Sequence, residues 1–287
     1  ETDAIGPRAK IVNHWSQPPT NFRSEGSLDT FFSERGVTAL EGVDTRALTK
    51  LIREKGVMNG AITSDPATVD MEALRAYKVE GAVQATSTKE AYTVKPEGQA
   101  TKKLALIDYG MKRNILRELV KRGAEVTVCP CGVTAQEINA MGVDGVMLAN
   151  GPGDPAENTQ LIDNLRGICA LGKPMFGICL GHQLLALAYG ARSEKLKYGH
   201  RGENQPVKNL ETGQVYVTSQ NHGYAIVGDS LPPQVGKELY RNVNDGTCEG
   251  LRYLGHPAFS VQFHPEACGG PLDTEWLFDE FFAMMAT

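Results

Sequence analysis

Between residues 104 and 190 the sequence alternates between short apolar runs and amphipathic helical patterns, and this alternation limits the fold more than any other feature. The apolar runs lie at 104–107, 125–129, 143–149 and 174–178, and glycines end the helical patterns between them. Strands that are apolar along their whole length are typical of parallel sheets covered by helices. The sequence therefore predicts an α/β fold with a mostly parallel sheet flanked by helices.

A polar segment at 81–103, which contains Pro96 and Gly98, precedes this region and predicts a linker. Residues 104–287 then form one predicted domain, which changes to short strand-like runs after Gln205 and ends in a helix from Thr274 to about Met285.

Residues 1–80 predict a smaller α/β domain. Ser27 is placed to cap a helix that ends near Arg35, and Asp44 is placed to cap a second one. Apolar runs at 11–14 and 57–62 predict strands. The chain opens on Glu1 with ten residues that suit a loop entered midway, so we expect an N-terminal piece to be missing.

The composition of the chain argues against several classes of protein. The 287 residues carry a formal charge of −5 without long charged runs, which argues against a surface built to bind phosphate backbones. Nothing approaches the roughly 20 apolar residues that span a bilayer, and the start lacks a signal-like pattern. Six cysteines are too sparse for a disulfide scaffold. We expect a cytoplasmic protein with reduced thiols.

Cys179 is the best candidate nucleophile. It lies in FGICLGHQLL, between a predicted strand and a helix, with glycines at 177 and 181. This G-x-C-x-G spacing is that of a nucleophile elbow, a tight turn that requires small neighbours. The helix N-terminus favours a thiolate over a thiol. The alternative is an unreactive buried cysteine, and the paired glycines favour the nucleophile.

His264 is the best candidate base among six histidines. It follows an apolar strand in SVQFHPEA, and Pro265 keeps it out of helical geometry. Glu266 lies two residues on, on the same side of an extended segment, where it can orient the imidazole. An exposed turn is the alternative. His182, one helical turn from Cys179, is a rival base, and His222 fits a loop beside a substrate pocket.

A third loop of interest, besides those that contain Cys179 and His264, is ANGPGDP at 149–155. Its glycines and prolines leave backbone N–H groups free to stabilise an oxyanion, together with the N–H of Leu180. A plain tight turn is the alternative. The three loops follow predicted strands, and in open α/β sheets ligands bind beyond the carboxyl ends of the strands.

Other motifs predict little chemistry. Cys129 and Cys131 form a C-x-C pair without a second pair at metal-ligand spacing, so we expect no metal site. Neither a Walker sequence nor a G-x-G-x-x-G motif is present, so nucleotide binding has no support.

GICLGHQ, NGPGDP and FHPEA together resemble the class I, triad-type glutamine amidotransferases. Further segments resemble the small-subunit family of the bacterial carbamoyl phosphate synthetases: GVDTRALTKLIREKG, LIDYGMKRNILRELVKRG, YGHRGENQPV and TSQNHGY. The resemblance spans essentially the whole chain and enters partway into the first domain of that family.

By this resemblance Cys179 is the nucleophile, His264 the base and Glu266 its partner. The resemblance also implies the glutamine-binding positions, which are Gly151, Gly153, Leu180, Gln183, Asn221, Gly223 and Tyr224. A serine in the family's longer first domain also contacts glutamine and has no counterpart here.

The resemblance implies that glutamine is hydrolysed through a cysteine thioester and that ammonia passes to a large synthetase subunit. That subunit makes carbamoyl phosphate, for pyrimidine and arginine biosynthesis, in a heterodimer or higher assembly. We expect no cofactor in this chain, since ATP and magnesium belong to the large subunit, and no nucleic-acid or membrane partner. Two rivals stay open: the amidotransferase partner of anthranilate synthase, which lacks a region like 1–80, and a degenerate subunit kept only for docking.

Overall fold

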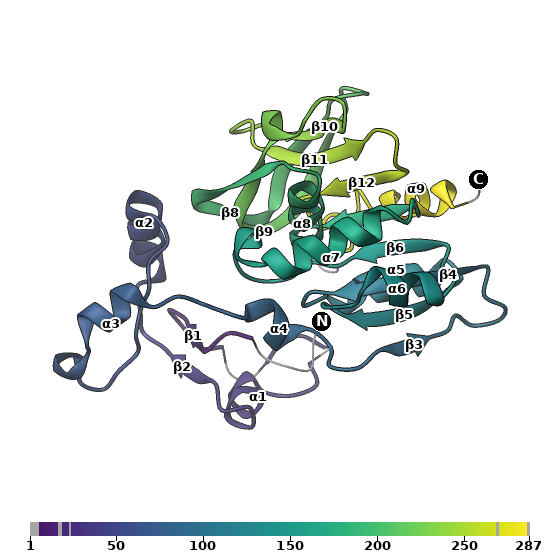
Figure 1. Ribbon diagram of the computed structural model, residues 1–287. Helices are drawn as coiled ribbons and strands as arrows, with labels where there is room; N and C mark the ends of the chain where they lie inside the picture. The colour runs from purple at the N-terminus through teal and green to yellow at the C-terminus, as the bar shows by residue number, and fades with distance from the viewer. Residues whose placement is uncertain (1–5, 17–18, 23, 268–269, 286–287) are drawn as a thin grey trace. The chain divides into compact units, whose positions relative to one another are not determined.

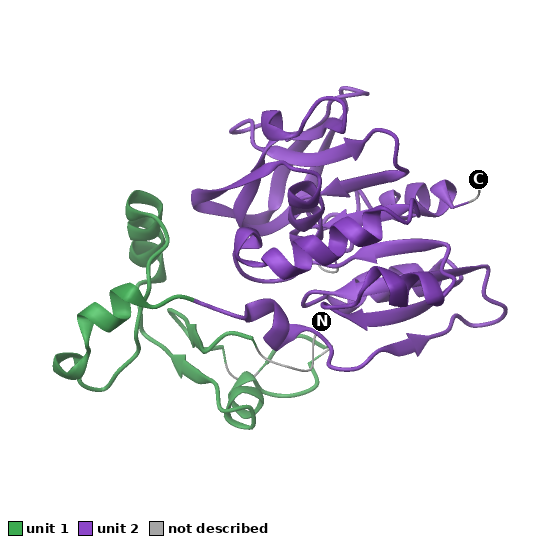
Figure 2. Ribbon diagram, in the orientation of Figure 1, with its two compact units in different colours: residues 1–78 green, residues 79–287 purple. Residues whose placement is uncertain are grey.

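The computed structural model of the chain describes residues 6–16, 19–22, 24–267 and 270–285. It divides into two compact units, Glu1–Lys78 and Val79–Thr287 (Figure 2). Residues 1–5, the start of the expected opening loop, lie outside the described residues.

Unit 1 is built from short elements around a two-stranded parallel sheet of β1 (Ala9–Ile11) and β2 (Thr38–Leu40). Both predicted helix caps are confirmed. The Ser27 side chain accepts from the backbone N–H of Thr30, and the Asp44 side chain accepts from that of Ala47. The helices are α1 (Leu28–Ser33), α2 (Thr45–Lys55), the 3-10 turn η1 (Pro66–Thr68) and α3 (Met71–Ala76).

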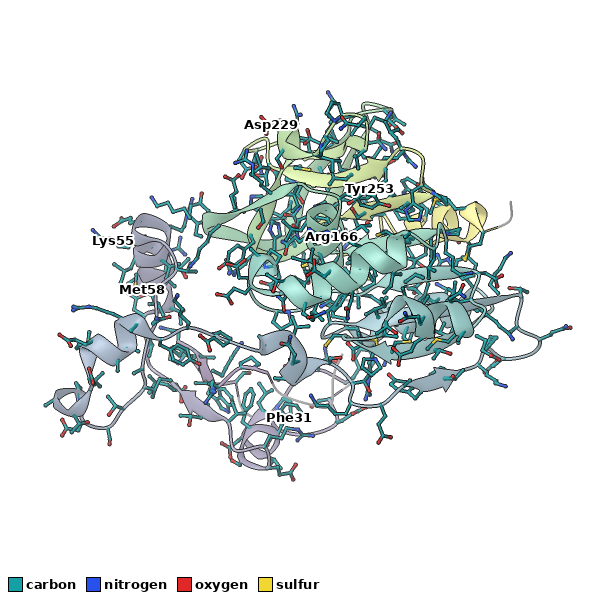
Figure 3. The ribbon with its side chains drawn as sticks, viewed as in Figure 1. Phe31, Lys55, Met58, Arg166, Asp229 and Tyr253 are labelled. Carbon is teal, nitrogen blue, oxygen red and sulfur yellow. The ribbon has the colours of Figure 1, made fainter. Side chains whose placement is uncertain are left out.

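The prediction of a strand at 57–62 is wrong. This segment pairs with no strand among the described residues, and its apolar side chains are exposed. The other elements of unit 1 also leave their apolar side chains accessible to solvent. None of its helices and strands has a fully buried residue among those described. Phe31 and Met58 are 39% and 50% exposed (Figure 3).

Unit 2 contains a ten-stranded sheet in the order β10-β8-β9-β11-β12-β7-β6-β4-β5-β3 (Figure 1). The strands are β3 (Tyr92–Val94), β4 (Lys102–Asp108), β5 (Ala124–Pro130), β6 (Gly145–Leu148), β7 (Met175–Ile178), β8 (Arg192–Asn209), β9 (Val215–Val227), β10 (Gly236–Asn242), β11 (Cys248–Tyr253) and β12 (Ala258–Val261).

The α/β character is confirmed, but the prediction of a mostly parallel sheet is wrong. Only the run from β12 through β7, β6 and β4 to β5 is parallel, and antiparallel pairings are more numerous across the described sheet. The reason lies in the connections. Helical crossovers join β4, β5, β6 and β7, whereas short connections without α-helices join β8 to β12. Short connections suit antiparallel strands.

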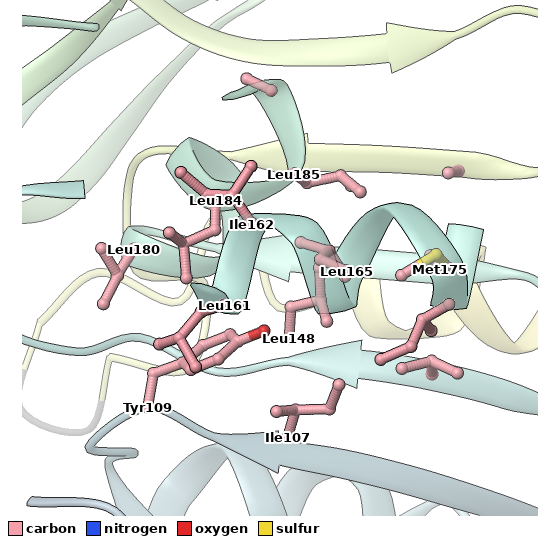
Figure 4. Close-up of a cluster of buried hydrophobic side chains, with 14 of the residues drawn as sticks. Ile107, Tyr109, Leu148, Leu161, Ile162, Leu165, Met175, Leu180, Leu184 and Leu185 are labelled. Atoms are coloured by element: carbon pink, nitrogen blue, oxygen red, sulfur yellow. The ribbon is translucent and has the colours of Figure 1, made fainter. Parts of the chain in front are cut away.

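Helices cover both faces of the parallel part. Along β4, Ala105 and Ile107 belong to one apolar cluster, and Leu104 and Leu106 belong to another, so alternate residues face opposite sides. Residues from α6 (Ala135–Ala140), α7 (Thr159–Cys169) and α8 (Leu180–Ala188) pack in the first cluster (Figure 4). Residues from α5 (Arg113–Lys121) and α9 (Leu277–Met284) pack in the second. A capping box of Thr134 and Glu137 opens α6.

The segment 81–103, predicted as a linker, carries α4 (Ala82–Thr86) and β3. β3 pairs with β5 in an antiparallel register, and Val83 is buried in the first apolar cluster, so the segment belongs to unit 2. Its polar composition arises because an edge strand buries few side chains. Within the described ranges, no helix combines the length and the apolarity needed to cross a membrane.

Candidate active site

Cys179 occupies the sharp turn that its flanking glycines predict, between β7 and α8. Among the described residues it is the only non-glycine with a positive φ, at φ 54° and ψ −105°. A Cβ on Gly181 would lie 2.4 Å from the Leu148 carbonyl oxygen, and one on Gly177 would lie 2.8 Å from the Gly181 oxygen. The backbone is packed too closely for larger residues, so the glycines are a requirement of this turn.

Sheet order brings the three unusual loops to one edge, because β7 lies between its parallel neighbours β6 and β12. Backbone hydrogen bonds connect the loops directly. The N–H of Gly181 donates to the carbonyl of Ala149 at 3.1 Å, and that of Cys179 donates to Val261 at 2.9 Å. The structure therefore assembles segments that lie far apart in the sequence.

His264 and Glu266 form a buried pair beside Cys179. Nδ1 of His264 lies 2.6 Å from Oε1 of Glu266, and the two residues are 3% and 1% exposed. Burial opposes protonation of the imidazole, but the Glu266 carboxylate and a hydrogen bond with the Cys179 side chain outweigh it and raise the pKa of His264 to about 9. The structure thus joins all three predicted triad residues.

Two residues near the start of α5 also reach this pair, and the sequence analysis missed them. Nζ of Lys112 lies 3.5 Å from Oε1 of Glu266, and the side-chain amide of Asn114 donates to the Glu266 backbone carbonyl. Burial raises the pKa of Glu266, but the charges of His264 and Lys112 lower it further, so the net shift is downward. The available signal was their position after β4, at the same sheet edge.

The rival base His182 has another partner. Its ring is fully buried, and its Nδ1 lies 2.8 Å from the Ser260 hydroxyl. Burial, followed by the nearby His222, lowers the pKa of His182 to about 3. A neutral ring bonded to Ser260 is a packed structural residue, so the geometry favours His264 as the base.

The predicted glutamine-binding positions all lie in unit 2. Gly151 and Gly153 follow β6, and a Cβ on Gly151 would lie 2.3 Å from the Tyr109 carbonyl oxygen. Leu180 and Gln183 open α8, and the Gln183 amide donates to the Tyr224 carbonyl at 2.8 Å. Asn221, Gly223 and Tyr224 lie on β9, which is joined to the His264 loop by a bond from the His264 N–H to the Ser219 carbonyl.

Comparisons with known proteins match both parts of the chain to protein families. Residues 105–284 match the family described as glutamine amidotransferase class-I. Residues 1–62 match the family described as carbamoyl-phosphate synthase small chain, CPSase domain. In fold, a GMP synthase subunit protein from Thermoplasma acidophilum superposes with a TM-score of 0.57 at 22% identity, covering 66% of this chain and 96% of its own.

Curated relatives extend the similarity over nearly the whole chain. The carbamoyl phosphate synthase small chain of Bacillus caldolyticus is 49% identical over 99% of this chain and 78% of its own length. That of Listeria monocytogenes is 47% identical over the same shares. Because this identity covers both units and well over two thirds of each relative, the chain belongs to the carbamoyl phosphate synthase small-chain family, with a class I glutamine amidotransferase domain.

Proposed function

We propose that this chain hydrolyses glutamine through a thioester on Cys179 and delivers the ammonia to a large synthetase subunit for carbamoyl phosphate synthesis. The observation that carries the proposal is the His264 ring, which is bonded to Glu266 and to the Cys179 side chain. With its pKa raised to about 9, the ring is an imidazolium at neutral pH. An imidazolium beside a thiol nucleophile both stabilises the thiolate and holds the proton that departing ammonia requires.

The reaction proceeds in two steps. The Cys179 thiolate attacks the side-chain amide carbon of glutamine, and the backbone N–H groups of Gly153 and Leu180 hold the oxyanion. His264 gives its proton to the leaving nitrogen, the C–N bond breaks, and ammonia departs. His264, now neutral, takes a proton from water, which attacks the thioester and releases glutamate as the C–S bond breaks.

Glutamine recognition is assigned to the backbone on either side of the nucleophile. Gly151 packs against the Tyr109 carbonyl, which fixes the loop after β6 beside the nucleophile. Asn221, Gly223 and Tyr224 form the strand that receives the amino-acid end of glutamine. Gln183 supports this strand through its bond to the Tyr224 carbonyl. Support from a side chain that is itself buried keeps the pocket preorganised.

The remaining chemistry is assigned to the partner. We propose a large carbamoyl phosphate synthetase subunit that holds ATP and magnesium, combines the ammonia with activated bicarbonate, and works in the cytoplasm for pyrimidine and arginine biosynthesis. No step in this chain requires a nucleotide, since thioester formation and hydrolysis need only a nucleophile, a proton donor and water.

The experiment is a paired assay of wild type and Cys179→Ala with a bacterial large subunit. We expect the variant to lose glutamine-dependent carbamoyl phosphate synthesis and glutaminase activity while free ammonia still supports synthesis. Glutaminase activity that persists in Cys179→Ala would overturn the nucleophile assignment. If wild type lacked glutaminase activity but still bound the large subunit, the docking-only alternative would hold instead.

A further inference from the structure

A second buried polar cluster lies on three neighbouring strands of the antiparallel part of the sheet. His200 comes from β8, Gln220 and His222 come from β9, and Glu249 comes from β11. His200 and His222 are register partners across the β8–β9 pair. All four side chains are buried, and Glu249 is completely inaccessible. The triad chemistry uses none of them.

The outer nitrogen of each histidine is already bound. Nε2 of His200 lies 2.7 Å from Oδ2 of Asp245, and Nδ1 of His222 lies 2.8 Å from the Tyr224 carbonyl oxygen. These acceptors place a proton on each outer nitrogen. Metal-binding histidines show the same arrangement, because a carboxylate or carbonyl that accepts from one nitrogen orients the other toward the ion.

The inner atoms of the four side chains lie close enough together to share one ion. Oε1 of Gln220 lies 2.9 Å from Nδ1 of His200 and 3.1 Å from Nε2 of His222, and Oε1 of Glu249 lies 3.1 Å from the same Nδ1. The ligand atoms of His200, His222 and Glu249 all lie within 4.8 Å of one another. Tetrahedral zinc ligands at metal distances of about 2.0–2.1 Å are about 3.3 Å apart.

The hydrogen bonding of this cluster is incomplete without a cation. With its proton on Nδ1, His222 presents a lone pair at Nε2, and this lone pair faces the Gln220 carbonyl oxygen. In addition, Oε2 of Glu249 is buried and has no hydrogen-bond partner. Facing lone pairs and a buried carboxylate with an unpaired oxygen are costly. A divalent ion accepts both lone pairs, and its charge compensates that of the buried carboxylate.

We propose that His200, His222 and Glu249, with Gln220 as the fourth ligand, bind one zinc-class divalent cation. Two imidazoles and two oxygens suit zinc better than magnesium or calcium, which take oxygen ligands. Four buried protein ligands make the site structural. The ion would crosslink β8, β9 and β11. On β9 its ligand His222 lies between the proposed glutamine-binding residues Asn221 and Gly223.

The competing account needs no metal. In it, His200 is an imidazolium held by two carboxylates. Burial disfavours that charge, but Glu249 and Asp245 outweigh burial and raise the pKa of His200 to about 9. The two accounts predict different metal contents. If zinc replaces the proton on Nδ1 of His200, the folded chain retains one zinc ion, whereas the metal-free account predicts none.

The test is a titration of the chelator-treated full chain with Zn²⁺, followed by elemental analysis after gel filtration. We expect one retained equivalent in wild type and in Cys179→Ala, which excludes the nucleophile thiol as the ligand. Glu249→Gln and His200→Gln should each lower the affinity at least about tenfold, and the outer variant Asp245→Asn about 10–100-fold. His256→Gln is the matched control, because His256 bonds Tyr189 and Lys173 away from the cluster.

A second readout uses proteins whose cluster is intact, so it does not depend on whether the cluster variants fold. Co²⁺ in place of Zn²⁺ should give the intense visible bands of a tetrahedral site without a thiolate charge-transfer band. Bound zinc should also raise the thermal midpoint of wild type and of His256→Gln. Failure to retain zinc, an octahedral or thiolate-bound cobalt spectrum, or equal retention by Glu249→Gln and wild type would each overturn the proposal.

Discussion

Cys179 adopts a backbone conformation that L-residues rarely occupy, with φ 54° and ψ −105°. Conformations of this kind cost about 1–3 kcal/mol each and persist at functional sites. Glycine tolerates a positive φ, although its flexibility in the unfolded chain costs about 0.5–1 kcal/mol. The conformation that positions the proposed nucleophile therefore lowers the stability of the fold.

We expect Cys179→Gly to be about 1 kcal/mol more stable than Cys179→Ala, with both variants inactive toward glutamine. The reason is that only glycine relieves the backbone, whereas alanine keeps the Cβ. Urea unfolding of the two variants measures the difference, and because both lack the thiol, their comparison isolates the Cβ. Equal stabilities, or a less stable glycine variant, would show that the turn is unstrained.

Activity measurements should separate the two candidate bases, His264 and His182, from the orienting residue Glu266. His264→Asn should abolish glutamine hydrolysis, because no other ring is bonded to the Cys179 side chain among the described histidines. Glu266→Gln should reduce it by about 10–100-fold, since the carboxylate orients the base and does not touch substrate. His182→Asn should retain turnover, because His182 packs against Ser260. Loss of turnover only in His182→Asn would reverse the assignment of the base.

The free energy of unfolding should depend on pH through the His264–Glu266 pair. Folding raises the pKa of His264 from about 6.5 to about 9, so its stabilising contribution is fully present below about pH 6.5 and is lost as the pH rises through about 9. Glu266→Gln removes the charge of the carboxylate, so the pKa of His264 is lower in this variant than in wild type. The stability difference between wild type and this variant should therefore shrink from pH 6.5 to pH 9.

Urea unfolding at several pH values measures this difference. In the metal-free chain His200, whose pKa is also raised to about 9, contributes equally to wild type and to Glu266→Gln and cancels from the comparison. A difference that stays constant or grows over this range would show that His264 is not charged in the folded protein.

At the scale of elements, the close approach of α8 to β6 depends on Gly181. A methyl group there would overlap the Leu148 carbonyl oxygen at 2.4 Å, and a backbone oxygen cannot rotate away as a side chain can. We expect Gly181→Ala to displace the start of α8, to destabilise unit 2 by about 1–3 kcal/mol as overpacking does, and to remove glutaminase activity.

Gly132→Ala is the matched control, because a Cβ at Gly132 meets nothing within 4 Å and its φ is not positive. It should leave both stability and activity within measurement error. Thermal unfolding and glutaminase assays of the two variants provide the comparison. If Gly181→Ala behaved like Gly132→Ala, the elbow would be looser than its geometry indicates.

Local signals predicted some elements well and others poorly. The caps at Ser27 and Asp44 located α1 and α2 correctly, because a cap is a contact between near neighbours in sequence. Strand β3 was read as a linker because its pairing with β5 depends on residues far along the chain. The triad loops were predictable from strand order, whereas Lys112 and the cluster at His200 depend on contacts between distant elements.

At the scale of the whole molecule, the two units differ in how much apolar surface they bury. Unit 2 packs two apolar clusters against its sheet, whereas the described elements of unit 1 have no fully buried residue. Helix α2 is amphipathic like α5, yet α2 buries none of its residues while α5 buries Ile115 and Leu119. Since most helix stability in proteins comes from tertiary packing, the same kind of helix should open far more often in unit 1.

Amide hydrogen exchange of the isolated chain should show this contrast directly. We expect the hydrogen-bonded amides of α2 to exchange at least about a hundredfold faster than those of α5, because each 1.4 kcal/mol of opening free energy changes the exchange rate tenfold. The core strand β4 should be the slowest to exchange, as five of its seven residues are buried. Comparing two helices of one chain removes differences in solvent and temperature. Equal protection of α2 and α5 would mean that unit 1 is held by contacts as stabilising as the core of unit 2, and its exposed apolar side chains would then carry no cost in stability.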